Sequence, residues 1–380
     1  MSNSMAGLAP PRRALVGVAL LLLGMTPRAL CAQVTLPLSG DSVRLTLGAF
    51  VDSYVAFDAG RPPALDRQLT TQAARHAEFN LNLAHVELGL SHPRVRGRFA
   101  LQAGTSVQAN YAGEPRIGTL SGPDVSRSVQ EATAGIRVHK TVWIDVGVFF
   151  SPYGAENWIS RDNWTYTRSL IADNSPYYEA GVKATWQATP AFSAQLHVMN
   201  GWQNISETNR DKALGTRLDY RVGDRLAFGY ALFAGNEQPD SLPSRLRLFH
   251  EVLVRATMHE RVQLAATVDR GTQARAGGGQ DMWHGGALLA RLTTGANSAV
   301  GLRAEWYHDP AQVIVVLPGS EGLRATGASA NLDIGVRGPL LWRTEYRALR
   351  SRTPVFETSR AGGDWRRRNH VLVTSLALTF

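Results

Sequence analysis

The sequence predicts an all-β fold, a transmembrane antiparallel β-barrel of about sixteen strands, from three observations. Apolar and polar residues alternate at every second position in most segments after residue 42. Short and long connections also alternate, which sorts them onto opposite ends of a barrel. The final strand, residues 369–380, needs a neighbour on each side, and pairing with the first strand near Phe50 would close the barrel.

Residues 1–32 are predicted to be a signal peptide that directs the chain through the inner membrane. Arg12 and Arg13 precede an apolar segment, residues 14–25, which is too short to span a bilayer of about 30 Å. A cleavage region follows, and it ends near Cys31, the only cysteine. The exported chain is therefore expected to contain no disulfide and no thiolate metal site.

Residues 33–380 are predicted to form the barrel as one domain. They contain no second apolar segment of about 18 residues, so the chain would cross a membrane with strands rather than with a helix. The formal net charge is +9, and nearly all of the basic excess is arginine. Such a balance can indicate nucleic acid, anionic lipid or an anion-selective surface. Export makes nucleic acid the least favoured partner.

The clearest strand is predicted over residues 94–111. Its apolar side chains share one face, and its arginine and amide side chains share the other. A helix would point Arg94, Arg96 and Arg98 in three directions, so the extended reading is favoured. The length exceeds an ordinary strand of about five or six residues and is typical of a tilted membrane strand.

Similar alternation predicts other strands in order along the chain. The segments are residues 44–57, 142–150, 214–220, 300–308, 341–349 and 369–380. Within residues 79–90 the apolar phase changes face, which predicts a β-bulge near Ala84.

The connections predict the orientation of the barrel. Short turns are expected at residues 91–93, 139–141, 189–190, 223–224, 259–260, 296–297 and 338–339. Long polar loops are expected at residues 58–75, 112–127, 152–175, 203–210, 237–245, 271–280, 309–322 and 351–368. Both termini then lie at the periplasmic end with the short turns, and the long loops are extracellular. Residues 33–42 are too few for a plug domain in the lumen.

A soluble β-propeller or β-sandwich is the main alternative fold. A propeller would repeat a motif about every 40–45 residues, and the sequence contains none. Its connections would not sort by length onto opposite ends. The membrane barrel is therefore favoured.

Three segments in the middle of the chain resemble a known family. They are SPYGAENW at residues 151–158, NSPYYEAGVKATW at 174–186 and VMNGWQNISETNRDKALGTRLDY at 198–220. They are similar to the putative β-barrel porin family called OmpL-like. The resemblance implies a bacterial outer-membrane channel. It brings no catalytic or binding residues with it.

Charged residues on the less apolar strand faces are predicted to point into the lumen, because an arginine facing mid-bilayer lipid costs about 2–4 kcal/mol. The predicted pore-lining residues are Arg94, Arg96, Arg98, Arg217, Arg303, Glu305, Arg343, Glu345 and Arg347. Two interpretations stay open. The arginines attract anions, or they pair with inward carboxylates and brace the wall.

The loop at residues 152–175 is the longest and the third long loop from the N-terminus. Its charged residues include Glu156, Arg161, Asp162 and Arg168. Folded inward, it would form a constriction with carboxylates facing the wall arginines. Folded outward, it would place its Trp and Tyr side chains at the membrane rim.

Aromatic residues near strand ends predict a girdle at the membrane interfaces, with sugar stacking as a second interpretation. The residues are Trp143, Trp186, Trp306, Trp342, Tyr111, Tyr178 and Tyr346. Phe380, after alternating apolar residues, resembles the assembly signal of bacterial outer-membrane barrels.

The leading functional prediction is a porin, a passive diffusion channel for small hydrophilic solutes that favours anions if its arginines are unpaired. No hydrolase, phosphate-loop or metal motif is present, so no enzyme activity and no cofactor are expected. The expected partners are outer-membrane lipid, small solutes or ions, and the barrel-assembly machinery; the sequence leaves open whether copies of the chain form an oligomer. A phospholipase-like barrel hydrolase and a closed structural or adhesion barrel are the alternatives.

Overall fold

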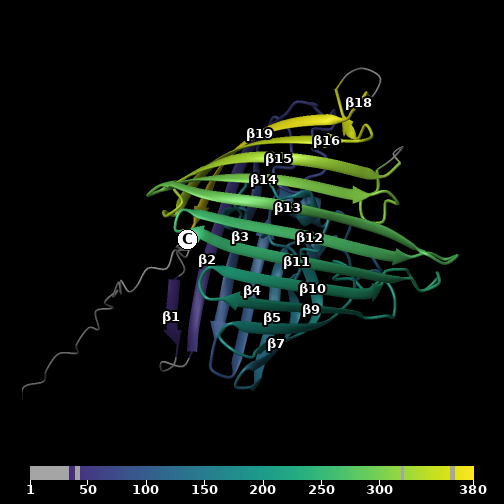
Figure 1. Cartoon of the computed structure of the whole chain (residues 1–380). Coiled ribbons are helices and arrows are strands. Elements are labelled where there is room, and N and C mark those ends of the chain that lie inside the picture. Colours follow the sequence, from purple (N-terminus) through teal and green to yellow (C-terminus); the bar gives the residue numbers. More distant parts are fainter. Residues whose placement is uncertain (1–33, 39–42, 318–320, 360–363) are drawn as a thin grey trace, which may run out of the picture.

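The computed structural model describes residues 34–38, 43–317, 321–359 and 364–380. The predicted signal peptide lies outside these ranges. Sixteen strands form one closed antiparallel barrel, each paired with its neighbours in the chain (Figure 1). The predicted fold class is confirmed. Within the described ranges, no helix is long and apolar enough to cross a membrane.

The barrel strands follow the predicted order. They are β2 (Val43–Asp58), β3 (Phe79–Ser91), β4 (Val95–Ala103), β5 (Val129–His139), β6 (Val142–Phe150), β7 (Tyr178–Gln187), β8 (Phe192–Met199), β9 (Ala213–Val222), β10 (Leu226–Asn236), β11 (Leu246–His259), β12 (Val262–Ala274), β13 (Gln280–Gly295), β14 (Ser298–Asp309), β15 (Leu323–Ile334), β16 (Leu340–Ser351) and β19 (Arg368–Thr379). The predicted short turns and long loops lie between them, at opposite ends of the barrel in Figure 1.

The period-two pattern determines which face of each strand meets lipid. On β14, Leu302 and Trp306 point outward and are exposed, whereas Arg303 and Glu305 point inward and are buried. Successive side chains of a strand point to opposite faces, so the apolar set forms the outer surface. On β14 this arrangement puts the charged side chains inside the barrel.

Strand β19 closes the barrel against β2, as predicted from the end of the sequence. Residues 371–379 pair with residues 50–58, and Phe380 N donates a hydrogen bond to Ala49 O at 2.9 Å. Beyond this point β2 continues, and a strand that the sequence did not predict, β1 (Val34–Leu38), pairs with residues 43–47. It covers the edge of β2 that β19 does not reach.

The strand predicted over residues 94–111 is wrong in its second half. Strand β4 ends at Ala103, and α1 (Thr105–Asn110) follows. The chain turns at Gly104, which has a φ of 139° and lies so close to Asn82 O that a Cβ atom would be 2.3 Å from it. Val107 and Tyr111, four residues apart, belong to one buried cluster, so their spacing fits a helix as well as a strand.

The β-bulge expected near Ala84 lies two residues earlier in β3. Asp52 pairs with Leu83 and Ser53 with Leu81, which leaves Asn82 as the extra residue. The Asn82 side-chain amide donates to Asp52 Oδ2 at 2.9 Å, inside the barrel. The bulge therefore turns a polar side chain inward.

Short elements occur within the long loops. They are α2 (Pro123–Ser126), η1 (Ser160–Asp162), α3 (Leu170–Asp173), β17 (Phe356–Glu357) and β18 (Trp365–Arg366). Strands β17 and β18 pair with each other and are not part of the barrel wall.

Part of the predicted aromatic girdle lies on the outer surface. Trp186, Trp306, Trp342 and Tyr346 are exposed. Tyr111 and Tyr178 are instead buried in the lumen, with ring centroids 4.2 Å apart. Trp143 faces inward, where the guanidinium groups of Arg96 and Arg137 lie 4.5 and 4.7 Å from its ring centroid. The girdle prediction is wrong for these three residues.

Deleting Phe380 is expected to lower the amount of folded barrel in the outer membrane without reducing export across the inner membrane. The deletion removes two backbone hydrogen bonds to Ala49 that follow directly after the end of β19. Heat-dependent gel mobility of outer-membrane fractions measures the folded fraction. A conservative Phe380→Tyr variant provides the control. Wild-type levels of folded protein in the deletion variant would contradict the prediction.

Candidate functional site

The connection between β6 and β7, residues 151–177, is called here the lumen loop because it packs inside the barrel. Leu170 N donates to Glu305 Oε2 at 2.6 Å, and Thr167 N donates to Glu345 Oε2 at 2.5 Å. Ser160 Oγ donates to Asp52 Oδ2 at 2.7 Å. Strands β14, β16 and β2 thus hold different parts of the loop.

Glycines in the wall allow the lumen loop to approach the strands. Gly301 on β14 lies so close to the loop backbone that a Cβ atom would meet Trp164 O at 1.8 Å. Gly285 on β13 leaves room for Ile171, whose Cγ2 atom would be 2.4 Å from an added Cβ. Neither glycine has a positive φ, so backbone conformation does not require glycine at these two positions. Their role is therefore close approach.

A buried network of four charged residues on β14 and β16 anchors the centre of the loop. Arg347 donates to both carboxylate oxygens of Glu305 at 3.0 and 2.9 Å. Arg303 lies 3.4 Å from the carboxylates of both Glu305 and Glu345. Arg303 also donates to Thr165 Oγ1 at 2.6 Å. Each charge therefore has an opposite charge beside it, which burial requires, although Arg303 Nε and Arg347 Nη1 are buried without a hydrogen-bond partner.

Two arginines position the η1 segment of the loop. Arg343 on β16 donates to Asp333 Oδ1 and to Asn163 O, both at 2.8 Å. Arg161 in the loop donates to Pro339 O at 3.2 Å and to Thr379 Oγ1 at 3.3 Å. Pro339 belongs to a short turn, so the loop extends from the long-loop end of the barrel to the short-turn end.

Arg168 connects the lumen loop to helix α1. Its guanidinium donates to Asn110 Oδ1 at 3.0 Å and forms an ion pair with Asp173 at 3.2 Å. The guanidinium carbon lies 3.3 Å from the ring centroid of Tyr177. Arg168 is fully buried and therefore braces the loop from within.

Six of the nine residues predicted to line the pore are buried beneath the loop or against it. They are Arg217, Arg303, Glu305, Arg343, Glu345 and Arg347. Arg217 forms an ion pair with Glu251 at 3.1 Å and donates to Pro152 O at 3.1 Å. The paired arrangement matches the bracing interpretation for these residues. Asp333 and Glu251, which complete the pairs, were not among the predicted site residues.

The other three predicted residues, Arg94, Arg96 and Arg98, are accessible near the short-turn half of the barrel. Arg96 forms an ion pair with Asp145, and the exposed side-chain fractions are 37% for Arg96 and 5% for Asp145. Arg98 forms an ion pair with Glu131 at 2.7 Å, with fractions of 41% and 10%. In both pairs the cation meets water and the carboxylate is covered.

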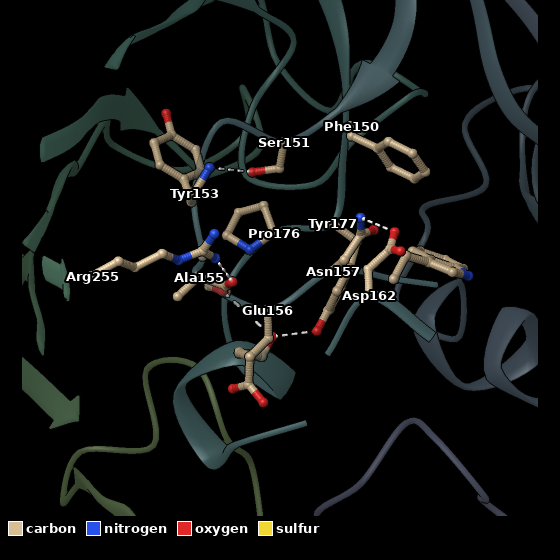
Figure 2. Close-up of a pocket in the computed structure, with 14 residues that line it drawn as sticks. Phe150, Ser151, Tyr153, Ala155, Glu156, Asn157, Asp162, Pro176, Tyr177 and Arg255 are labelled. Carbon is tan, nitrogen blue, oxygen red and sulfur yellow. Dashed lines mark hydrogen bonds between the residues drawn. The ribbon is translucent and has the colours of Figure 1, made fainter. Parts of the chain in front are cut away.

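A cavity of about 370 Å³ lies between the lumen loop and β11 (Figure 2). Its charged lining residues are Glu156 and Asp162 of the loop and Arg255 of β11. Figure 2 shows Arg255 and Asp162 on opposite sides of the cavity, and both are exposed. Arg255 was not predicted, although the inward alternation of Phe249, Glu251, Leu253 and Arg255 along β11 could have indicated it.

The carboxyl groups of the cavity differ in their surroundings. Although part of the Asp162 side chain is exposed, the protein around it partly desolvates the carboxyl and raises its pKa, and the nearby Arg161 and Arg343 oppose this rise. Burial likewise raises the pKa of Glu156, against the opposing effect of Arg303. Asn157 Nδ2 donates to Asp162 Oδ2 at 2.9 Å and holds that carboxylate in place.

Apolar side chains form two clusters in the lumen. One cluster includes Tyr153, Ile171, Phe233, Phe249 and Trp283. A second includes Phe50, Val107, Tyr111, Trp158 and Tyr178. A wide barrel cannot be filled by wall side chains alone, and here the lumen loop and α1 supply the additional residues. Across the described ranges, no group of three or more His, Cys, Asp or Glu side chains is placed to hold a metal ion.

A closed barrel of sixteen antiparallel strands with an apolar outer surface is the architecture of bacterial outer-membrane porins. The chain belongs to the family described as "Putative beta-barrel porin-2, OmpL-like", whose model matches residues 44–380. This confirms the family that the sequence resembled. No curated protein matches the chain.

Solved structures with the same fold have very different sequences. An anion-selective porin from Comamonas acidovorans is 12% identical with a TM-score of 0.61, over 89% of this chain and 100% of that one. The outer-membrane channel DcaP of Acinetobacter baumannii is 10% identical with a TM-score of 0.60, over 90% and 99%. OmpT of Vibrio cholerae, in its trimer form, is 7% identical with a TM-score of 0.60, over 90% and 100%.

Gly301→Val is expected to displace the lumen loop, because the added side chain would overlap the Trp164 carbonyl. Overpacking of this kind costs about 1–3 kcal/mol. Limited proteolysis of the folded barrel should therefore cleave the loop faster than in the wild type. Gly277→Val is the matched control, since an added Cβ there meets nothing within 4 Å. Equal cleavage of the two variants would contradict the assigned role of Gly301.

Proposed function

We propose that the protein is a passive diffusion channel for small hydrophilic solutes with a preference for anions. The observation that carries the proposal is the unequal exposure within the accessible ion pairs. Arg96 and Arg98 meet the lumen, and their partners Asp145 and Glu131 are covered. A solute entering this region therefore meets positive charge before negative charge, which raises the entry rate of anions.

The buried network contributes little to this preference. Arg303, Arg343 and Arg347 are enclosed and neutralised by carboxylates at 2.8–3.4 Å. Their proposed role is to hold the lumen loop. The preference for anions depends instead on Arg94, Arg96, Arg98 and Arg255, which are partly or fully exposed.

The lumen loop is proposed to form the constriction of the channel. It occupies the interior along the length of the barrel, and it faces the accessible wall with Asn157 and Asp162, both exposed. Arg255 on the opposite side of the cavity would give a field across the path (Figure 2). A solute would then be oriented as it passes between opposite charges.

A closed structural barrel is the second candidate, and the two apolar clusters in the lumen favour it. Planar bilayers separate the candidates, because a channel gives conductance steps and a closed barrel gives none. The family and fold are those of channels rather than enzymes, so we propose no catalytic activity. Export by the predicted signal peptide, barrel-assembly machinery and a trimer like that of OmpT also stay predictions.

Replacing Arg94, Arg96 and Arg98 together with Gln is expected to shift ion selectivity towards cations. The change removes exposed positive charge and leaves Asp145 and Glu131 without their partners. The reversal potential under a salt gradient in planar bilayers reports the change. Arg275→Gln, in an exposed loop pair with Asp281, is the control. An unchanged reversal potential in the triple variant would exclude these arginines as the source of selectivity.

Acidification is expected to increase the anion preference, through loss of the negative charge on Asp162. Because the pKa of Asp162 is raised, protonation begins at a higher pH than for an ordinary aspartate. Asp162→Asn should show the higher anion preference already at neutral pH and a smaller change on acidification. Reversal potentials measured across the acidic range test this, with Glu260→Gln in a short turn as control. Identical pH profiles for wild type and Asp162→Asn would exclude the role of Asp162.

A further inference from the structure

The outer surface of the barrel carries a row of basic side chains near the long-loop end. The row consists of His250, Arg270, His284, His308, Arg324 and Arg352, one from each of the strands β11 to β15 and the last directly after β16. Each of the first four residues pairs directly with the next across the strands. Arg352 N then donates to Arg324 O at 2.8 Å. With strands about 4.8 Å apart, this basic row is about 24 Å long.

The basic row belongs to the lipid-facing side of the wall. His308 is in phase with Leu302 and Trp306, which are exposed on the outer surface, and out of phase with the buried Arg303 and Glu305. Trp306 precedes His308 by two residues, and aromatic side chains of this kind mark the membrane interface. The row therefore lies just beyond the apolar band, at the depth of lipid headgroups.

The basic row has no counter-charge of its own. The outward positions of β11 to β16 and of β19 contain no Asp or Glu within the described residues. In the same ranges, the guanidinium groups of Arg270, Arg324 and Arg352 make no ion pair and no hydrogen bond. Like charges placed directly opposite each other destabilise a sheet. Arg350 on β16 and Arg368 on β19 are a further pair of like charges directly opposite each other.

The charge is confined to one side of the barrel. At the same end of the other side, outward positions are apolar and exposed, including Phe57 on β2, Phe79 on β3, Leu101 on β4, Val198 on β8 and Leu214 on β9. A general requirement of the membrane rim would place similar residues around the whole circumference. The row is therefore a local feature that fits an anionic partner.

We propose that the basic row binds the phosphate groups of an anionic glycolipid in the outer leaflet of the membrane. The long loops are extracellular in this class of barrel, so the row meets that leaflet. Arginine binds phosphate through two parallel hydrogen bonds, and imidazolium adds charge. A line of three arginines and three histidines across several strands matches headgroups with more than one phosphate. His284 and His308 share a hydrogen bond at 3.2 Å, so the fixed positive charge of the row comes from its arginines. The neighbouring apolar surface accommodates the acyl chains.

The test uses the full-length barrel, folded in neutral detergent and titrated with diphosphoryl lipid A, with bound lipid counted by native mass spectrometry. The triple variant Arg270→Gln, Arg324→Gln, Arg352→Gln is expected to bind about 100-fold more weakly, at roughly fivefold per arginine. A second triple variant, Arg225→Gln, Arg261→Gln, Arg337→Gln, changes the same charge in exposed short turns at the other end. It should bind as the wild type does.

Several results would overturn the proposal. These are wild-type affinity in the first triple variant, equal loss in both variants, or equal binding of phosphatidylcholine by the wild type. A change of oligomeric mass with unchanged lipid binding would assign the row to contacts between copies and overturn it too. If the first variant does not fold, the salt dependence of lipid binding by the wild type decides. Binding that weakens as salt rises supports the row, and binding unaffected by salt excludes it.

Discussion

Backbone groups that enter the lumen of a wide barrel need hydrogen-bond partners, and satisfying them is the constraint on which this structure depends. The lumen loop has no neighbouring strand with which to form a regular ladder. Charged side chains of the wall form hydrogen bonds with the loop backbone in place of such a ladder. Glu305 and Glu345 accept from backbone N–H groups of the loop, and Arg343 donates to its carbonyls. Buried backbone groups without such partners are rare in proteins.

The same arrangement explains why so much charge is buried in the C-terminal half of the wall. Removing ionised groups from water is unfavourable unless each is paired and hydrogen-bonded. Arg347 meets this condition with both oxygens of Glu305, and Arg303 meets it with two carboxylates and a threonine. These ion pairs fix the position of the lumen loop and add little to the free energy of unfolding. The accessible arginines on β4 are in a different situation, because water screens them.

The sequence predicts local features of this protein well and loop placement poorly. The strands follow from a period of two, which depends only on the direction of successive side chains. Helix α1 was not predicted because the spacing of Val107 and Tyr111 fits both a helix and a strand. Strand β1 was not predicted because its pairing with β2 depends on how far β19 extends. Whether an inward arginine is free or covered depends on the lumen loop, which is far away in sequence. Gly285 and Gly301 were the local signals of close approach.

Strand β2 is the first barrel strand in the chain, and it pairs with β19, the last one. Every residue pair between them is separated by more than three hundred positions in the chain. One edge of β2 must therefore wait, unpaired, until nearly the whole protein exists, and unpaired edges invite association with other chains. The hairpin of β1 with β2 forms between near neighbours, and such local contacts form early. This hairpin shortens the unpaired edge of β2 and defines the residue at which pairing with β19 starts.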